Sequence, residues 1–234
     1  MADRPTLLLV PGLLLTAGFW RHQVAGLHDL ANCQPTEATL GHDNLSDIAA
    51  AILRSAPERF ALAGLSFGGY VAFEIMRQAP QRVLRLALLD TQARPDPPEV
   101  AERRLGFMRL AGTGRFLGVT DRLLPLLLHP SRLADRDLTD ELKAMAEAVG
   151  REGFLRQQKA IMGRPDSRPD LARIGCPTLI LCGRQDALTP LEGHREMHAG
   201  IAGSRLVVLE DCGHLPPLEK PAETNAALRE WLSA

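Results

Sequence analysis

The sequence predicts an α/β fold: a mostly parallel sheet of about six strands, flanked by helices and interrupted by a helical cap insertion. Two observations carry this prediction. From Thr6 to Thr91, short apolar runs alternate with longer amphipathic segments, which is the pattern of a parallel sheet covered by helices. The alternation stops between two proline-bearing segments, residues 94–100 and 163–170, and then resumes. A chain of 234 residues is long enough for one domain with such an insertion.

The part of the chain before the insertion is predicted to hold four strands and three helices. The strands are apolar runs typical of parallel strands buried on both faces, at 6–10, 33–40 (the weakest), 60–66 and 82–91. The segments between them have helical spacing, at 19–30, 47–56 and 67–79. We expect Ser46 to N-cap the second helix and Pro80 to end the third.

Residues 96–168 are predicted to form the cap, built from several short helices. Apolar residues recur there among charges at roughly helical intervals, and no convincing strand occurs. The strand–helix alternation then returns, with strands at 177–183 and 204–211 and helices at 190–198 and 221–232. The predicted organisation is therefore a core domain of residues 1–95 and 169–234 with the cap inserted between its halves.

Composition excludes several classes of function. The net charge of −1 provides no basic surface for nucleic acid and no polybasic segment for a membrane. The four cysteines show no metal-binding spacing, so we expect reduced thiols, no metal and no cofactor: Cys33, Cys176, Cys182 and Cys212. His194 and His198, four residues apart, lack a third ligand and are interpreted as solvated helix residues. We expect a monomer or homodimer that acts on a small molecule.

The segment GLSFG (64–68) matches G-x-S-x-G in an informative context. An apolar strand ends at Ser66 and a helix begins at once, which is the arrangement that holds a nucleophilic serine on a strained, exposed turn. Gly64 and Gly68 provide the room that such a turn requires. A capping serine in a glycine-rich turn is the alternative interpretation.

A serine hydroxyl needs a base, and the base needs a carboxylate that orients it. The best histidine is His214, between the last strand and the last helix. The best carboxylate is Asp186, directly after the strand at 177–183, and Asp90 is the second choice. The chain order of serine, acid and histidine is the one expected on such a sheet.

An oxyanion hole completes this chemistry with backbone N–H groups aimed at the carbonyl oxygen. Phe67 follows the nucleophile, and Leu13 follows the tight turn after the first strand, so these two residues are the expected donors. The apolar segment VPGLLLTAGFW (10–20) could also belong to an export signal. However, Pro11-Gly12 divides its apolar run, and cleavage near Ala17 would remove both a core strand and a donor. We therefore expect a cytoplasmic protein.

Three blocks of the sequence together resemble the α/β-hydrolase fold superfamily, in particular the compact bacterial carboxylesterases with a helical lid. They are VPGLLLTAGFW, AGLSFGGYVAFE (63–74), and the tail PTLILCGRQDALTP (177–190) with DCGHLPPLEKP (211–221). The resemblance implies the same roles for the nucleophile, acid, base and two oxyanion donors: Ser66, Asp186, His214, Leu13 and Phe67. The family usually has His-Gly where this chain has Pro11-Gly12, so the support of the oxyanion turn is an open question.

A serine nucleophile argues against the branches of that family that use aspartate, the haloalkane dehalogenases and epoxide hydrolases. We expect a carboxylesterase for short-to-medium uncharged acyl groups, because the residues expected around the cleft are apolar: Leu14, Phe107, Met108, Phe116, Leu117, Leu123, Leu127 and Phe154. The same residues suit a lactonase, thioesterase, C–C bond hydrolase, acyltransferase or perhydrolase, since fold does not determine function. A ligand-sensing protein with slow residual hydrolysis is a further alternative.

Overall fold

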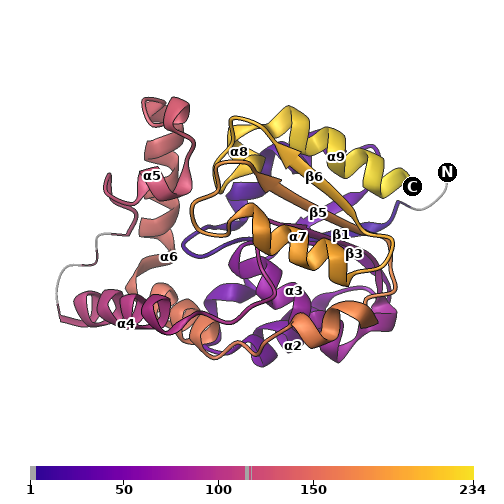
Figure 1. Ribbon diagram of the computed structural model, residues 1–234, viewed down its shortest axis with the longest axis horizontal. Coiled ribbons are helices and arrows are strands. Elements are labelled where there is room, and N and C mark those ends of the chain that lie inside the picture. Colours follow the sequence, from indigo (N-terminus) through magenta and orange to yellow (C-terminus); the bar gives the residue numbers. More distant parts are fainter. Residues whose placement is uncertain (1–3, 114–115, 117) are drawn as a thin grey trace.

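Six parallel strands form the central sheet of the computed structural model, which describes residues 4–113, 116 and 118–234 (Figure 1). In chain order they are β1 (Thr6–Val10), β2 (Asn32–Pro35), β3 (Phe60–Leu65), β4 (Val83–Leu89), β5 (Thr178–Gly183) and β6 (Arg205–Leu209). Their spatial order is β2-β1-β3-β4-β5-β6, and every neighbouring pair is parallel. The predicted fold class is confirmed. The predicted strand at 33–40 is right only at its start, because β2 ends at Pro35 and Ala38–Leu40 forms a 3₁₀ turn.

Alternate side chains of the central strands enter two separate hydrophobic cores, one on each face of the sheet. Leu7 and Leu9 of β1 pack in one core, and Leu8 and Val10 pack in the other. All four are buried. This is why the first strand reads as a continuous apolar run and not as an alternating one.

Helices of the core cover both faces of the sheet. The first core is closed by α1 (Arg21–Leu27), α8 (Pro216–Glu219) and α9 (Pro221–Ser233), and the second by α2 (Leu45–Ser55), α3 (Phe67–Gln78) and α7 (Leu191–Gly200). In Figure 1, α8 and α9 lie above the sheet, and α2 and α3 lie below it. Parallel strands require this covering, since both of their faces are apolar.

Two predicted helix boundaries are wrong. Asn44, not Ser46, caps α2: it has an extended backbone, and its side chain accepts the Asp47 N–H at 2.8 Å. Ser46 lies inside the helix, which begins at Leu45 because the Asn44 cap satisfies a free N–H of the first turn. The predicted helix at 19–30 is a 3₁₀ turn (Ala17–Trp20) followed by α1.

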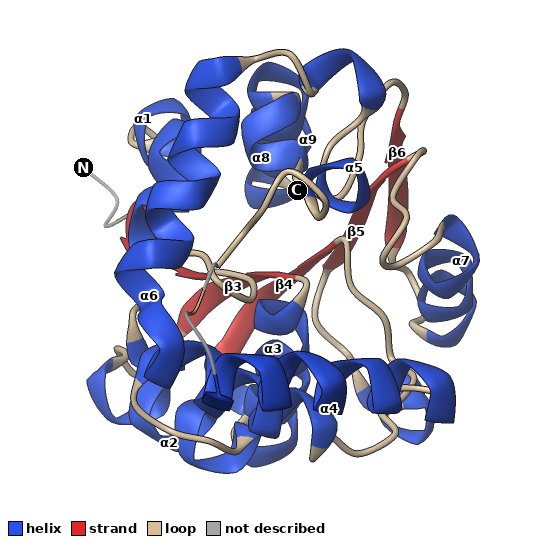
Figure 2. Ribbon diagram, turned by 90° about the vertical axis from the view of Figure 1, so that its left-hand side faces the viewer, coloured by secondary structure: helices blue, strands red, loops and turns tan. Residues whose placement is uncertain are grey.

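The inserted part of the chain contains α4 (Pro98–Thr113), α5 (Leu124–Leu127) and α6 (Arg136–Met162). Several short helices were predicted, but α6 spans 27 residues with a break at Gly150, which has φ 67°. Figure 2 shows α4 and α6 in front of the sheet, with α6 running down the left side of the view and α4 along its lower edge. We call residues 96–168 the cap; its status as a separate domain stays a prediction. Across the described residues, no helix is both long and apolar enough to cross a membrane.

Candidate active site

Ser66 occupies a strained turn between β3 and α3. Its φ of 54° and ψ of −114° are rare for a residue with a side chain. A Cβ on Gly64 would lie 2.2 Å from the Gly68 carbonyl oxygen, and one on Gly68 would lie 2.1 Å from the Val10 carbonyl oxygen. Only glycine fits at either position, so the two glycines expected from the sequence are required by close backbone contacts. Ser66 is partly exposed and lines a cavity beneath the cap.

Asp186 and His214 form a buried hydrogen-bonded pair. His214 Nδ1 lies 2.8 Å from Asp186 Oδ2, and the Thr189 hydroxyl donates to the same oxygen at 2.5 Å. The other Asp186 oxygen accepts the backbone N–H groups of Leu188 and Thr189. Burial opposes ionisation of Asp186, but the His214 imidazole and these hydrogen bonds outweigh it and hold the pKa of the carboxyl well below its usual value. The aspartate is therefore suited to orienting the imidazole and stabilising its protonated form.

Ser66 and His214 line the same cavity, Ser66 from the end of β3 and His214 from the loop after β6. The carboxyl ends of parallel strands meet at one edge of a sheet, which explains how residues far apart in sequence come together. Within the described chain, no hydrogen bond joins the two side chains. Such bonds often tighten only when a substrate is bound.

Each of the two expected oxyanion donors has a free backbone N–H, but their side chains lie in different surroundings. Leu13 lines the cavity, whereas the Phe67 side chain is fully buried in the core and only its backbone can serve the site. In the described part of the chain, neither backbone N–H has a hydrogen-bond partner. Both are therefore available to an oxygen atom in the cavity.

The turn that carries Leu13 is held from outside by the cap. Leu14 has a φ of 61°, and its N–H donates to Gln157 Oε1 on α6 at 3.0 Å. Gly12 O accepts the Leu15 N–H at 3.3 Å, which closes the turn. Gln157 is fully buried. The sequence offered no signal for this residue, because 143 positions separate it from the turn that it supports.

Asp90, the second choice for the acid, lies beside the pair but does not bind the histidine. Its Oδ1 accepts the Gly183 N–H at 2.9 Å, and the residue is completely buried. Burial, and then the charge of Asp186, raise the pKa of Asp90 well above its ordinary value. The possible ligand atoms of Asp90, Asp186 and His214 lie within 4.8 Å of one another, which is a spacing that a metal ion can use. Since Asp186 Oδ2 and His214 Nδ1 are hydrogen-bonded to each other, we interpret the cluster as an acid–histidine pair with Asp90 beside it.

His194 corrects a further expectation. It is fully buried on α7, not solvated, and its Nε2 accepts the Thr91 N–H at 3.1 Å. Burial lowers its pKa to about 4, so its imidazole is neutral at pH 7. His194 therefore supports the backbone next to Asp90, which the four-residue spacing with His198 did not indicate.

The cavity has a volume of about 730 Å³ and is lined mainly by apolar side chains. Six of the eight residues expected there do line it: Leu14, Phe107, Phe116, Leu123, Leu127 and Phe154. Met108 does not, because it lies on another side of α4 from Phe107. Leu117 lies outside the described residues. The exposed apolar side chains at the cavity include Leu110 and Leu126, which are 69% and 40% exposed.

One wall of the cavity is polar, which the sequence pattern did not indicate. Asp96 binds Arg104 and the buried Arg164, each at 2.7 Å, and Arg104 also donates to Gln158 at 3.1 Å. Asp96, Arg104 and Gln158 line the cavity. The sequence predicts only a proline-rich linker at residues 94–100, yet Asp96 in this segment joins α4 to the end of α6.

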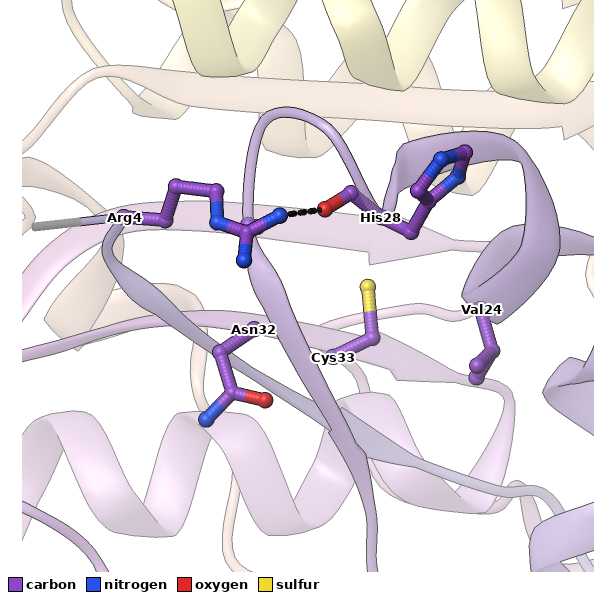
Figure 3. Close-up of a pocket in the computed structure, with 6 residues that line it drawn as sticks. Arg4, Val24, His28, Asn32 and Cys33 are labelled. Carbon is purple, nitrogen blue, oxygen red and sulfur yellow. Dashed lines mark hydrogen bonds between the residues drawn. The ribbon is translucent and has the colours of Figure 1, made fainter. Parts of the chain in front are cut away.

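A second pocket lies at the opposite, amino-terminal edge of the sheet (Figure 3). Arg4 precedes β1, Asn32 begins β2, and Arg4 donates to the His28 carbonyl oxygen. Burial raises the pKa of the Cys33 thiol in this pocket, which makes it a poor nucleophile.

Comparison with known proteins agrees with this architecture. The model of the alpha/beta hydrolase family matches residues 7–227. An esterase from Thermogutta terrifontis, determined with malate bound, is 31% identical, with a TM-score of 0.87 over 98% of this chain and 91% of the esterase. The enol-lactonase from Burkholderia xenovorans LB400 has the same TM-score over 100% and 93% of the chains, and at 23% identity it shows the fold alone. RutD of Shigella flexneri, named provisionally as a carbamate hydrolase, is 27% identical over 100% of this chain and 93% of its own.

Proposed function

This chain belongs to the alpha/beta hydrolase family and is a hydrolase, and we propose that it cleaves carboxylic esters through an acyl-enzyme on Ser66. The observation that carries the proposal is the geometry of three side chains. Asp186 binds His214 at 2.8 Å, and His214 shares a cavity with Ser66 on its strained turn. This is the arrangement that a serine nucleophile requires.

The chemistry proceeds in two halves. Ser66 Oγ bonds to the carbonyl carbon while its proton moves to His214 Nε2, and the carbonyl electron pair moves to the oxygen. The N–H groups of Leu13 and Phe67 stabilise that charge, and removing one such donor costs about 10²–10³ in rate. The ester C–O bond then breaks, and the imidazolium gives its proton to the departing alcohol. Water repeats the sequence on the acyl-serine and releases the acid.

The cavity favours a short-to-medium uncharged acyl group. Phe116 and Phe154 lie against each other with ring centroids 5.4 Å apart, and both line the cavity. Apolar side chains also remain exposed around it, so an apolar substrate group would remove them from water. The two acidic residues that line the described cavity are both ion-paired: Asp96 with Arg104 and Arg164, and Asp121 with Lys143.

A panel of p-nitrophenyl esters with acyl chains of two to twelve carbons tests the proposal. We expect turnover with a maximum among the shorter chains, loss of turnover in Ser66→Ala, and labelling of the wild type by a fluorophosphonate at Ser66. Absence of ester turnover, or unchanged turnover in Ser66→Ala, would refute it. A phenyl carbamate and an added alcohol acceptor belong in the same panel. Cleavage of the carbamate faster than of the esters would identify a carbamate hydrolase, which is the activity in the name of RutD. Transfer of the acyl group mainly to the alcohol, and not to water, would identify an acyltransferase.

A further inference from the structure

The carboxyl group of Glu219 binds the loop that carries His214 on both sides of the histidine. Glu219 is the last residue of α8 and is only 2% exposed. Its Oε1 accepts the backbone N–H groups of Gly213 and Leu215, each at 3.1 Å. The N–H of His214 itself donates to the Leu127 carbonyl oxygen of the cap at 2.9 Å. All three consecutive N–H groups are therefore occupied, which fixes the backbone from which the imidazole projects.

The other oxygen of Glu219 reaches the cap. Its Oε2 accepts the His129 N–H at 2.7 Å, next to the segment that binds the His214 N–H. A Cβ on Gly213 would lie 2.6 Å from the His129 nitrogen, so the two loops touch through their backbones. One buried carboxyl thus joins the loop of the proposed base to the end of α5.

The hydrogen bonds at Glu219 stabilise its ionised form. Both oxygens accept N–H groups, and a protonated carboxyl would need an acceptor for its own O–H, which the described contacts do not provide. Burial raises the pKa of Glu219, while the three N–H groups and the His214 charge oppose that rise. The arrangement therefore favours the carboxylate, placed where its charge acts on the His214 imidazole.

We propose that Glu219 is a positioning residue. Its carboxylate fixes the position of the His214 loop relative to the cap and stabilises the protonated imidazole during catalysis. The role in catalysis rests on the proposed function. Among the described residues, four other titratable groups lie near the imidazole: Asp186, which is ion-paired with it, Asp90, whose pKa is raised by burial, the neutral His194, and the Cys212 thiol. Glu219 differs from these groups because its carboxylate also binds the backbone on both sides of His214.

Glu219→Gln tests the proposal with little change in shape. The amide must turn its NH₂ group toward either the N–H groups of Gly213 and Leu215 or the N–H of His129. The hydrogen bonds on that side are then lost together with the negative charge. We expect kcat to fall at least tenfold, KM to stay within about threefold, and the acid limb of the pH profile of kcat/KM to move to lower pH. Glu223→Gln, an exposed acid on the next helix, is the matched control and should behave as the wild type.

A measurement without substrate separates this proposal from the proposed function. The His214 ring signals, identified by NMR against a His214→Gln sample, should titrate with a lower midpoint in Glu219→Gln than in the wild type. This readout holds even if the wild type hydrolyses none of the esters tried. An unchanged midpoint in a folded variant would overturn the proposal, whether or not kcat fell, because a purely structural role does not alter the charge on the imidazole.

A second pair of variants tests the hydrogen bond from the His129 N–H to Glu219 by itself. His129 has a φ of −59°, and Leu128 before it has an extended backbone, so proline fits at position 129 while removing the N–H that Glu219 accepts. His129→Ala removes only the side chain. We expect His129→Pro to lower kcat several-fold relative to His129→Ala. Equal kcat values in the two variants would contradict the role proposed for the bond between Glu219 and the His129 N–H.

Discussion

The backbone N–H of Leu14 donates a 3.0 Å hydrogen bond to the side-chain oxygen of Gln157, which joins the turn after β1 to α6 of the cap. Relatives of the kind that the sequence resembles usually have a histidine in that turn, whereas this chain has Pro11. The bond from Gln157 holds Leu14 in its left-handed conformation and leaves the N–H of Leu13 free. The cap is therefore part of the support for the proposed oxyanion hole.

Replacing Gln157 with methionine is expected to lower kcat about tenfold with little change in KM. The buried Leu14 N–H would lose its acceptor, and the turn that presents Leu13 would lose its anchor, while the side-chain volume stays similar. Steady-state kinetics on the best ester measures both constants. Gln158→Met is the comparison, because Gln158 binds Arg104 at the cavity wall and should affect KM more than kcat. The reverse pattern in the two variants would contradict this assignment.

Asp186→Asn and Asp90→Asn distinguish the two candidate acids. An asparagine at 186 favours the wrong imidazole tautomer, and the corresponding change in serine protease triads costs about 10⁴ in kcat. Burial raises the pKa of Asp90 well above its ordinary value, and asparagine keeps an acceptor for the Gly183 N–H, so kcat should fall less than about tenfold. A larger loss in Asp90→Asn than in Asp186→Asn would reverse the assignment.

His194 should make the free energy of unfolding depend on pH. Its pKa is lowered from 6.5 to about 4 in the folded protein, so the unfolded chain binds the extra proton between these values. Stability from this group is complete above about pH 6.5 and is lost as the pH falls toward about 4, by up to roughly 3 kcal/mol.

Urea unfolding of the wild type and of His194→Gln at pH 7.5 and pH 5 measures this effect. Glutamine keeps an acceptor for the Thr91 N–H but does not titrate, so the difference between the proteins isolates the histidine. The variant should lose less stability than the wild type on acidification. Parallel losses in both proteins would show that His194 is not the source.

Gly68→Ala should abolish ester hydrolysis and lower the melting temperature. Its Cβ would lie 2.1 Å from the Val10 carbonyl oxygen, so the backbone on either side of Ser66 must move. Gly112→Ala on α4 is the matched control, since nothing lies within 4 Å of the added atom. In a helix that change is neutral or stabilising by up to about 1 kcal/mol. Normal activity in Gly68→Ala would mean that the turn tolerates a side chain.

The sequence alone determined the features that depend on local pattern. Apolar runs such as 6–10 identified parallel strands, and the context of Ser66 identified its turn, because strand burial and backbone strain leave signatures in adjacent residues. Local pattern was less reliable at boundaries, where Asn44 caps α2 in place of Ser46. The repeating apolar residues of the cap indicated helices but could not show that α6 is one long element with a break.

Only the tertiary structure showed which residues far apart in the sequence contact one another at the site. Asp90 and Asp186 both follow strands of the same sheet, and the loop geometry determines that Asp186 binds His214. Gln157 and Glu219 gave no local signal, since each binds backbone N–H groups that any residue carries. A side chain that satisfies a distant backbone leaves no periodic trace in the sequence, so the supports of the site become visible only once the cap is folded against the sheet.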